Sequence, residues 1–345
     1  MPHTGADLIQ RNLSTNTDWL TEHGIGYGDV MAQGASHDTL WVACAKAVPL
    51  IAEKYGVTTA QDQEELRQYI GQALTWERAQ LPAHVDRMVL SCSGLYGFMR
   101  HPDAVQELKS LLEPHFDAVD LILYVRRQDD VILADYANAV RLGSTNDTLA
   151  EYASACLRPD ISRTPYLFYK HEVSKWLDVW GDTALTLRRY SSTDFIDGDL
   201  VTDMLGVLLG TWDPDLTGFS RAPEMNGSLS APGVAFFREL NRALDADRAG
   251  DMPAVQVHKL FHRLSEISLP ASPRPIMPAD LSHKIMTHFA GANMWLQERF
   301  APDLDGPFFP ERPDHPEFGN TDRMSTDDAI SLSGRLLASL MQEGP

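Results

Sequence analysis

The chain has 345 residues, a net charge of −19 at pH 7, and hydrophobic and charged contents of 43% and 22%, which are ordinary values for a globular protein with a sizeable core. The acidic balance argues against general binding to nucleic acid, which requires a basic surface. No apolar run reaches the ~18 residues of a membrane-spanning helix, and the first residues lack the basic and apolar segments of a signal peptide, so we expect a cytoplasmic protein.

The sequence opens with a glycine turn that leads into an amphipathic helix. Gly5 precedes a segment in which Ile9, Leu13 and Leu20 fall near one helical face, and Gly24 is placed to end the helix. The free N–H groups and the positive dipole end of such a helix can bind an anion. A Thr-Gly pair ahead of a helix is, however, more often a plain cap than a phosphate site.

Helices and short strands alternate in the rest of the first half. The pattern predicts helices over residues 37–56, 59–80 and 101–112, a short buried strand over residues 86–91 and a second strand over residues 116–125. It then predicts a helix from about residue 128 to 143, a helix ending near residue 181, and a strand over residues 183–187. Strands that alternate with longer helices indicate βαβ units and a parallel sheet.

From residue 199 onward the predicted elements are helices. They span residues 199–210, 231–249, 253–268, 279–300 and 325–342, with a proline-rich loop over residues 302–323. We therefore predict one domain over residues 1–345, made of an α/β core (1–198) and a helical extension (199–345).

Paired arginines follow the clearest predicted strand. Arg126 and Arg127 come directly after residues 116–125, at the carboxyl end where parallel sheets bind ligands, and arginine can hold a phosphate with two hydrogen bonds. The alternative is that these arginines pair with nearby aspartates at the surface, such as Asp129 or Asp130.

Cysteine and histidine spacing gives little indication of a metal site. Cys44, Cys92 and Cys156 are scattered, which is typical of reduced, buried thiols. His258 and His262 have the spacing of a zinc pair, but no third ligand is evident. We predict no metal.

Residues 2–10, PHTGADLIQ, resemble the first loop of bacterial sulfotransferase-family proteins, which is roughly P-K-T-G-T-T-x-I-Q. The resemblance implies that Thr4, Gly5, Ala6 and Asp7 bind the sulfate donor and that His3 stands at the position of the catalytic lysine. Histidine is mostly neutral at pH 7, and Asp7 would repel a phosphate.

The stretch after residue 125 resembles the site that holds the nucleotide 3′-phosphate in the same family. Arg126 matches the arginine of that site, and Tyr136 matches a tyrosine. Ala134 matches a serine position but has no hydroxyl group to donate. The resemblance thus implies that Arg126 and Ala134 line the cofactor site with one phosphate ligand retained.

Residues 91–93, Ser-Cys-Ser, resemble a Ser-Ser-Glu segment of related proteins, whose glutamate is suited to act as general base. Ser93 cannot take that role, so the base is unassigned; His101 and His171 are substitutes that the sequence offers. Weaker resemblance runs in order along most of residues 1–310, through residues 169–181, 187–190, 203–205, 226–230, 236–241 and 293–300.

The resemblance implies an α/β fold: a P-loop NTPase-like parallel sheet flanked by helices, with a mostly helical C-terminal part. The glycine turn of such folds follows a buried strand, and the sequence holds no residues for it ahead of Met1. We therefore expect either that the chain starts further upstream or that the first strand is missing.

The implied function is transfer of a sulfuryl group from 3′-phosphoadenosine 5′-phosphosulfate (PAPS) to a hydroxyl or amine acceptor, with a saccharide as the expected acceptor. Catalysis would rest on positioning and charge stabilisation. The altered residues leave a second hypothesis open, a catalytically impaired member that binds a nucleotide or glycan or serves in assembly. A kinase on the same fold is a third, but the sequence lacks G-x-x-x-x-G-K-[ST].

Overall fold

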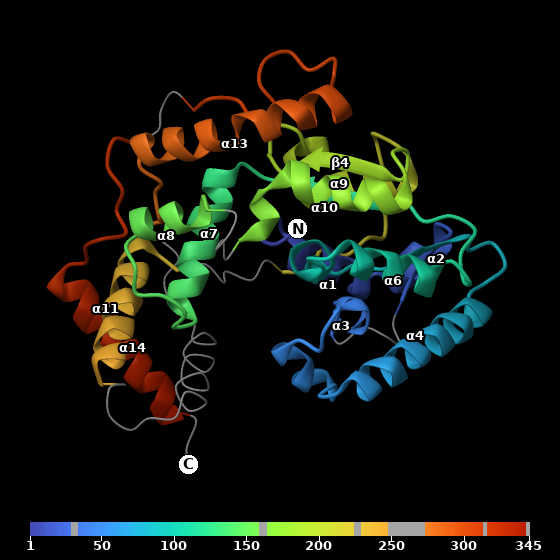
Figure 1. Cartoon of the computed structure of the whole chain (residues 1–345), viewed down its shortest axis with the longest axis horizontal. Coiled ribbons are helices and arrows are strands. Elements are labelled where there is room, and N and C mark those ends of the chain that lie inside the picture. Colours follow the sequence, from blue (N-terminus) through green and yellow to red (C-terminus); the bar gives the residue numbers. More distant parts are fainter. Residues whose placement is uncertain (29–33, 159–163, 224–228, 248–272, 313–315, 343–345) are drawn as a thin grey trace. The chain divides into compact units, whose positions relative to one another are not determined.

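The structure is a computed structural model, and it describes residues 1–28, 34–158, 164–223, 229–247, 273–312 and 316–342. Contacts between residues divide the chain into two compact units. The first unit comprises Met1–Arg126 and Phe168–Glu224, and the second comprises Arg127–Leu167 and Met225–Pro345 (Figure 1). The predicted single domain, with an α/β core (1–198) and a helical extension (199–345), rests on the pattern of predicted elements and stays a prediction.

The first unit contains the four strands of the described residues. Strand β1 (Ile25–Tyr27) pairs in parallel with β2 (Arg87–Val89), and β3 (Leu121–Val125) pairs in parallel with β4 (Leu185–Arg189). These are two separate two-stranded sheets. The register aligns Gly26 with Met88 and Leu123 with Leu187.

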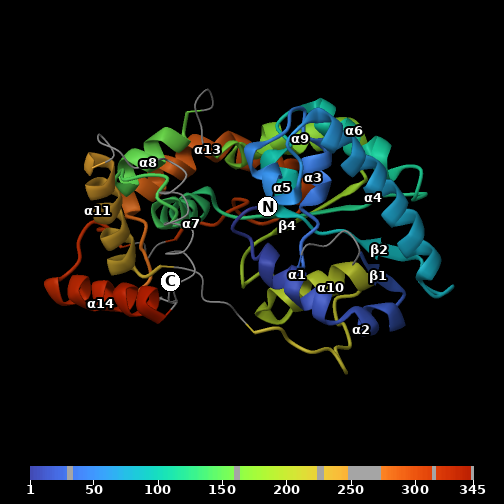
Figure 2. The same ribbon diagram turned by 90° about the horizontal axis from the view of Figure 1, so that it is seen from below.

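Two groups of helices flank these strands. One group packs around α1 (Ala6–Thr15) and includes α2 (Thr17–Glu22) and α10 (Leu200–Leu209). The other group packs around α6 (Pro102–Leu112) and includes α3 (Thr39–Cys44), α4 (Ala60–Gln80), α5 (Ser93–Phe98) and α9 (Tyr169–Trp180). Figure 2 shows the two groups on opposite sides of the strands. The first unit is therefore layered helix, strand, helix.

Apolar spacing explains which faces of these elements are buried. Ile9 and Leu13 lie one helical turn apart on α1 and meet Leu205 of α10 and Ile25 of β1 in one hydrophobic cluster. The exposed fraction of Leu205 and of Ile25 is 0%. This cluster fixes α1 against the strands, and so it also fixes the loop that precedes α1.

A buried polar network ties β4 to α10. The Asp203 carboxylate, which is 0% exposed, accepts from the Tyr124 hydroxyl at 2.6 Å and from Nε of Arg188 at 3.1 Å. It also accepts from the Ile196 N–H at 3.1 Å. Segments 187–190 and 203–205, which carry part of the family resemblance, thus contact each other.

Helices make up the second unit. α7 (Gln128–Arg141) contacts α8 (Leu149–Cys156), α11 (Ala231–Asp247) and α13 (Ala279–Phe300), and α11 also contacts α14 (Thr326–Gln342). Asn241 of α11 donates to the carbonyl oxygens of Val140 and Thr145 at 2.8 and 2.7 Å and thereby closes the end of α7. Three short 3-10 helices complete the described elements: Leu50–Tyr55, Pro165–Leu167 and Ile196–Gly198.

The predicted α/β class is confirmed, and so are most of the predicted elements. Several features differ. The helix predicted to run from the Gly5 turn to Gly24 is two helices, α1 and α2, and the predicted helix over residues 37–56 is two short helical segments, Thr39–Cys44 and Leu50–Tyr55. The elements β1, α5 and α8 were not predicted. The strand predicted as buried over residues 86–91 is the three-residue β2, whose side chains are exposed or half-buried. The predicted helix over residues 253–268, with His258 and His262, lies outside the described residues.

Within the described segments, every helix is too short or too polar to cross a membrane.

Candidate functional site

The candidate site begins with the loop that leads into α1. Gly5 is the N-cap residue of α1 and adopts a left-handed conformation with φ 73°, and no side chain caps the helix there. His3 also has a positive φ, 59°, which is uncommon for a residue other than glycine. The first-turn N–H groups of α1 therefore lie at an end without a side-chain cap, next to a tightly turned loop.

The Thr4 hydroxyl is used inside this loop. Thr4 is 2% exposed, and its Oγ1 donates to the Met1 carbonyl oxygen at 2.6 Å. Its hydroxyl group stabilises the turn from within. Ala6 and Asp7 follow as the first residues of α1; Ala6 is half-buried and Asp7 is exposed, so the Asp7 carboxylate stands in solvent at the positive end of the helix dipole.

Arg126 lies beside the loop. Its Nη1 donates to the His3 carbonyl oxygen at 3.0 Å, and its guanidinium carbon lies 5.2 Å from the centre of the Tyr190 ring. The Tyr169 hydroxyl donates to the Arg126 carbonyl oxygen. Arg126 follows β3 and Tyr190 follows β4, so the structure brings the carboxyl ends of two parallel strands to the loop.

Gly5 is required by this close packing. A Cβ atom at Gly5 would lie 2.3 Å from Cδ2 of Leu200 and 3.5 Å from the Tyr190 ring. The loop can approach β4 and α10 this closely because residue 5 has no side chain.

The Ser-Cys-Ser segment after β2 forms another wall of the site. Nε2 of Gln10 on α1 donates to the Ser91 carbonyl oxygen at 3.2 Å. The Ser91 N–H donates to Nδ1 of His37 at 2.9 Å, and Nε2 of His37 lies 2.5 Å from the Gly28 carbonyl oxygen. The fully buried His37 thus joins the ends of β1 and β2.

Cys92 is a free thiol that lies next to a carboxylate. Its Sγ donates to Oδ1 of Asp38 at 3.2 Å. Burial first, and then the negative charge of Asp38, raise the pKa of the Cys92 thiol well above its usual value. Cys92 is accordingly a poor nucleophile near neutral pH, and Asp38 is the carboxylate that contacts the segment where a general base was expected.

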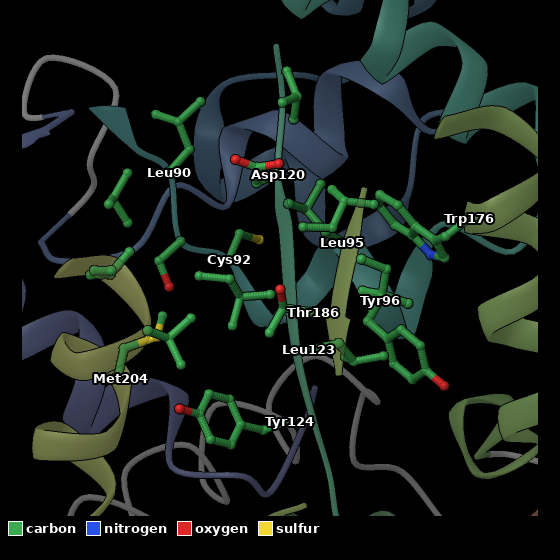
Figure 3. A pocket seen from close by; sticks show the side chains of 18 of the residues that line it. Leu90, Cys92, Leu95, Tyr96, Asp120, Leu123, Tyr124, Trp176, Thr186 and Met204 are labelled. Carbon is green, nitrogen blue, oxygen red and sulfur yellow. The ribbon is translucent and has the colours of Figure 1, made fainter. Parts of the chain in front are cut away.

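A cavity of about 460 Å³ lies between these parts. The loop contributes Met1, Thr4 and Ala6 to its lining, and the segment after β2 contributes Ser91, Cys92 and Ser93. Figure 3 shows Leu90 and Cys92 on the side of β2 and Leu123 and Tyr124 on β3. All lining residues belong to the first unit.

The predicted site residues are thus brought together in part. His3, Thr4, Gly5, Ala6, Asp7 and Arg126 lie in the first unit around the start of α1. Ala134 is a half-buried residue of α7 and belongs to the second unit. Its predicted role beside the nucleotide 3′-phosphate remains a prediction.

The two paired arginines have different partners. Arg126 contacts the loop, whereas Arg127 forms a buried two-bond ion pair with Asp129, with Nε–Oδ1 and Nη2–Oδ2 distances of 3.1 and 2.9 Å. The alternative that the arginines pair with nearby aspartates therefore holds for Arg127, although its pair is buried and not at the surface.

The suggested replacements for the general base are exposed. His101 precedes α6 and His171 lies on α9, with 76% of the His171 side chain exposed. Sequence reasoning gave no site role to Tyr190, Tyr169 or His37. Tyr190 and Tyr169 entered only as parts of the weakly resembling segments 187–190 and 169–181. The position of Tyr190 directly after a predicted strand is the signal that could have identified it.

Comparison with protein-family models, with curated proteins and with solved structures found no match. Within the described residues, no group of three or more histidine, cysteine, aspartate or glutamate side chains is arranged to hold a metal ion.

Proposed function

We propose that the protein binds PAPS at the loop before α1 and transfers its sulfuryl group to a hydroxyl or amine acceptor, with a saccharide as the expected acceptor, on a P-loop NTPase-like fold. The observation that carries the proposal is the hydrogen bond from Arg126, at the end of β3, to the His3 carbonyl oxygen of that loop. It joins the two segments that resemble the donor loop and the 3′-phosphate site.

The residues present fit an anionic donor in part. The N-terminus of α1 has no side-chain cap, which leaves its first-turn N–H groups directed at the loop. Arg126 adds a fixed positive charge, and its guanidinium is a five-donor fork suited to phosphate oxygens. Thr4 adds no ligand, because its hydroxyl group is bonded to Met1.

The roles of the chain's own residues follow from this arrangement. The α1 N–H groups and Arg126 would hold and orient the donor's negative oxygens, and His3 in its protonated form would offset charge that develops on the departing oxygen. PAPS would supply the sulfuryl group, whose bond to the departing phosphate oxygen breaks as a bond to the acceptor oxygen or nitrogen forms. The acceptor proton requires a base, for which Asp38 is the carboxylate in contact with Cys92.

One set of observations favours a second function, binding without transfer. Asp7 places a carboxylate at the donor loop, Thr4 is turned inward, and Ser93 cannot accept the acceptor proton. A protein with these features would retain nucleotide or glycan binding and lose turnover.

Calorimetry tests the nucleotide site. The protein should bind adenosine 3′,5′-bisphosphate more tightly than 5′-AMP, and Arg126→Ala should remove the difference, since a charge-assisted hydrogen bond contributes about 1.5–3 kcal/mol, roughly ten- to a hundred-fold in affinity. Arg67→Ala is the matched control, because Arg67 pairs with Glu64 on α4. Equal affinities of the wild type for the two nucleotides would exclude this site.

The loop variants separate transfer from binding. Asp7→Thr should raise the affinity for PAPS about two- to five-fold, a small effect because the carboxylate is exposed and screened, and His3→Lys should add to it. Sulfate transfer to a panel of saccharides is then measured for the wild type, Asp7→Thr and the double variant. Tighter donor binding without transfer favours the binding function, and robust wild-type transfer that neither change affects would mean that the loop is not the donor site.

A further inference from the structure

The edges of two strands, β2 and β3, line the cavity of the first unit. Its lining includes every residue over 86–93 and every residue over 118–124. Successive side chains of a strand point to opposite faces, so a cavity beside one face would touch alternate residues only. Contact with consecutive residues places the cavity along the edges of the two strands.

Backbone hydrogen bonds identify which edge of β2 pairs with β1 and which edge is left over. The Arg87 N–H donates to the Gly24 carbonyl oxygen at 3.3 Å, and the Gly28 N–H donates to the Val89 carbonyl oxygen at 3.4 Å. Successive peptide groups of a strand point to opposite edges. Since Arg87 and Val89 face β1, the backbone groups of Met88 face the other edge.

The same reasoning applies to β3. The Leu121 N–H donates to the Ala184 carbonyl oxygen at 2.6 Å, and the Tyr190 N–H donates to the Val125 carbonyl oxygen at 2.7 Å. These residues face β4, so the backbone groups of Ile122 and Tyr124 face away from it. Among the described residues, β2 pairs with β1 alone and β3 with β4 alone, which leaves the second edge of each strand toward the cavity.

The carboxyl ends of β2 and β3 lie at the same loop. Ser91, just after β2, accepts from Gln10 of α1, and Arg126, just after β3, donates to His3. The two strands therefore run in the same direction toward the Met1–Gly5 loop. Met1 and Thr4 themselves line the cavity, so the loop begins where a strand between β2 and β3 would end.

We propose that this cavity is the place of a fifth parallel strand, an extended apolar segment of about five residues, matched to the five of β3, whose carboxyl end joins Met1. It would pair with Met88 on one side and with Ile122 and Tyr124 on the other, and so unite the two sheets as β1-β2-insert-β3-β4. The insert leads through the glycine loop into α1.

The lining side chains specify an apolar insert. Ile9, Met204 and Leu208 border the cavity from the α1–α10 side, and Leu95 and Trp176 border it from the α5–α9 side. A strand covered by helices on both faces is apolar on both faces, as in the centre of parallel sheets. The volume of 460 Å³ is about three times the ~150 Å³ of a stable empty apolar cavity, which suits a segment of chain.

Amide hydrogen exchange of the unmodified full chain is the first test. The exchange rates of successive backbone amides should alternate along β2 and along β3. The amides of Met88, Ile122 and Tyr124 should exchange at least about tenfold faster than those of Arg87, Leu121 and Leu123, which face a neighbouring strand. Equal protection of both sets would overturn the proposal, because it would mean that the cavity edges are already paired.

Fusion of a strand ahead of Met1 is the second test. A Val-Ile-Val-Ile-Val extension should raise the unfolding midpoint by roughly 5 °C or more and slow exchange at Met88, Ile122 and Tyr124. The matched control has proline at its second and fourth positions, which removes two backbone donors. No shift with either extension, or an equal shift with both, would overturn the proposal. So would an equal effect of the same peptide added as a separate chain, because the strand is proposed to be continuous with Met1.

Discussion

Gly5 links the conformation of the donor loop to the packing of the first unit. Its φ of 73° and the 2.3 Å separation between an added Cβ and Leu200 both oppose substitution. Gly210, the C-cap of α10, has a similar φ of 69° but nothing within 4 Å of its Cβ position. The two positions therefore separate backbone strain from steric overlap.

We expect Gly210→Ala to cost about 1 kcal/mol of unfolding free energy from the left-handed conformation alone. Gly5→Ala should cost about 1–3 kcal/mol more because of the overlap, and Leu200→Ala should recover part of that excess. Chemical denaturation of the three variants measures the differences. An equal cost at both glycines would mean that α10 can move away from the loop.

The Asp129 carboxylate gives a second prediction at the scale of single residues. It is 0% exposed, and it accepts from Arg127 and, at 2.6 Å, from the Ser282 hydroxyl. Burial opposes its ionisation, but the bonds from Arg127 and Ser282 keep the pKa of Asp129 below its usual value. Its neighbour Asp130 pairs with Arg312 at 2.6 Å in a more exposed position.

Removal of the buried carboxylate leaves the Arg127 charge without its main partner, so Asp129→Ala should cost about 3–5 kcal/mol. Asp130→Ala should cost about 1 kcal/mol or less. Replacement of the whole buried pair, Arg127→Met with Asp129→Leu, should recover much of the loss. Denaturation curves of the three variants provide the measurement, and a double variant as unstable as Asp129→Ala would contradict the explanation.

At the scale of elements, hydrophobic pattern and caps predicted the structure where they are strong. The apolar run of β3 was recognisable, and so was a threonine cap of α4 at Thr58 or Thr59, which the structure places at Thr59. Strand β1 was missed because it has three residues, one of them Gly26, and is held by its pairing with β2. β2 was predicted as buried, yet its side chains are exposed or half-buried because the cavity runs along its edge.

The candidate site was predictable only as two separate stretches. Sequence could place Arg126 after a strand and Gly5 before a helix, but the bond between Arg126 and His3 joins residues 123 positions apart. Spacing alone could not separate Arg126 from Arg127, because both stand beside the same aspartates; only the resemblance singled out Arg126. The left-handed conformation at His3 had no signal in the sequence either.

The N-terminus of α4 gives a pH prediction. The Asp62 carboxylate accepts from the Thr58 N–H and hydroxyl group and from the Thr59 N–H, at 2.8–2.9 Å. These bonds, those from Thr58 first, lower the pKa of Asp62 to about 2. Because the pKa is lower in the folded than in the unfolded chain, the cap stabilises α4 fully above the usual pKa of about 4. That contribution is lost as the pH falls toward 2.

We expect an NMR titration of the Asp62 carboxyl carbon to have its midpoint near pH 2. Asp62→Asn should be less stable than the wild type at pH 6, and the difference should shrink between pH 4 and pH 2. A midpoint near 4, or a difference independent of pH, would show that the capping box contributes little to α4.

At the scale of the whole molecule, the charge of −19 acts over longer distances than any contact in the site. The donor site relies on Arg126 and on helix N–H groups, which act over a few ångströms, whereas the summed charge repels any anion during its approach. A small nucleotide can enter past this repulsion because it meets only the local groups. A long polyanion meets the whole surface.

We therefore expect no retention on heparin resin at physiological salt, and no retention when the salt is lowered to about 50 mM, where the screening length grows and repulsion strengthens. Elution volume against that of an inert protein of equal size is the measurement, with Asp7→Thr as a control that changes the site charge by one unit. Retention that weakens as salt is added would contradict this expectation. It would indicate a local basic surface on the molecule and point to a polyanionic glycan as the acceptor.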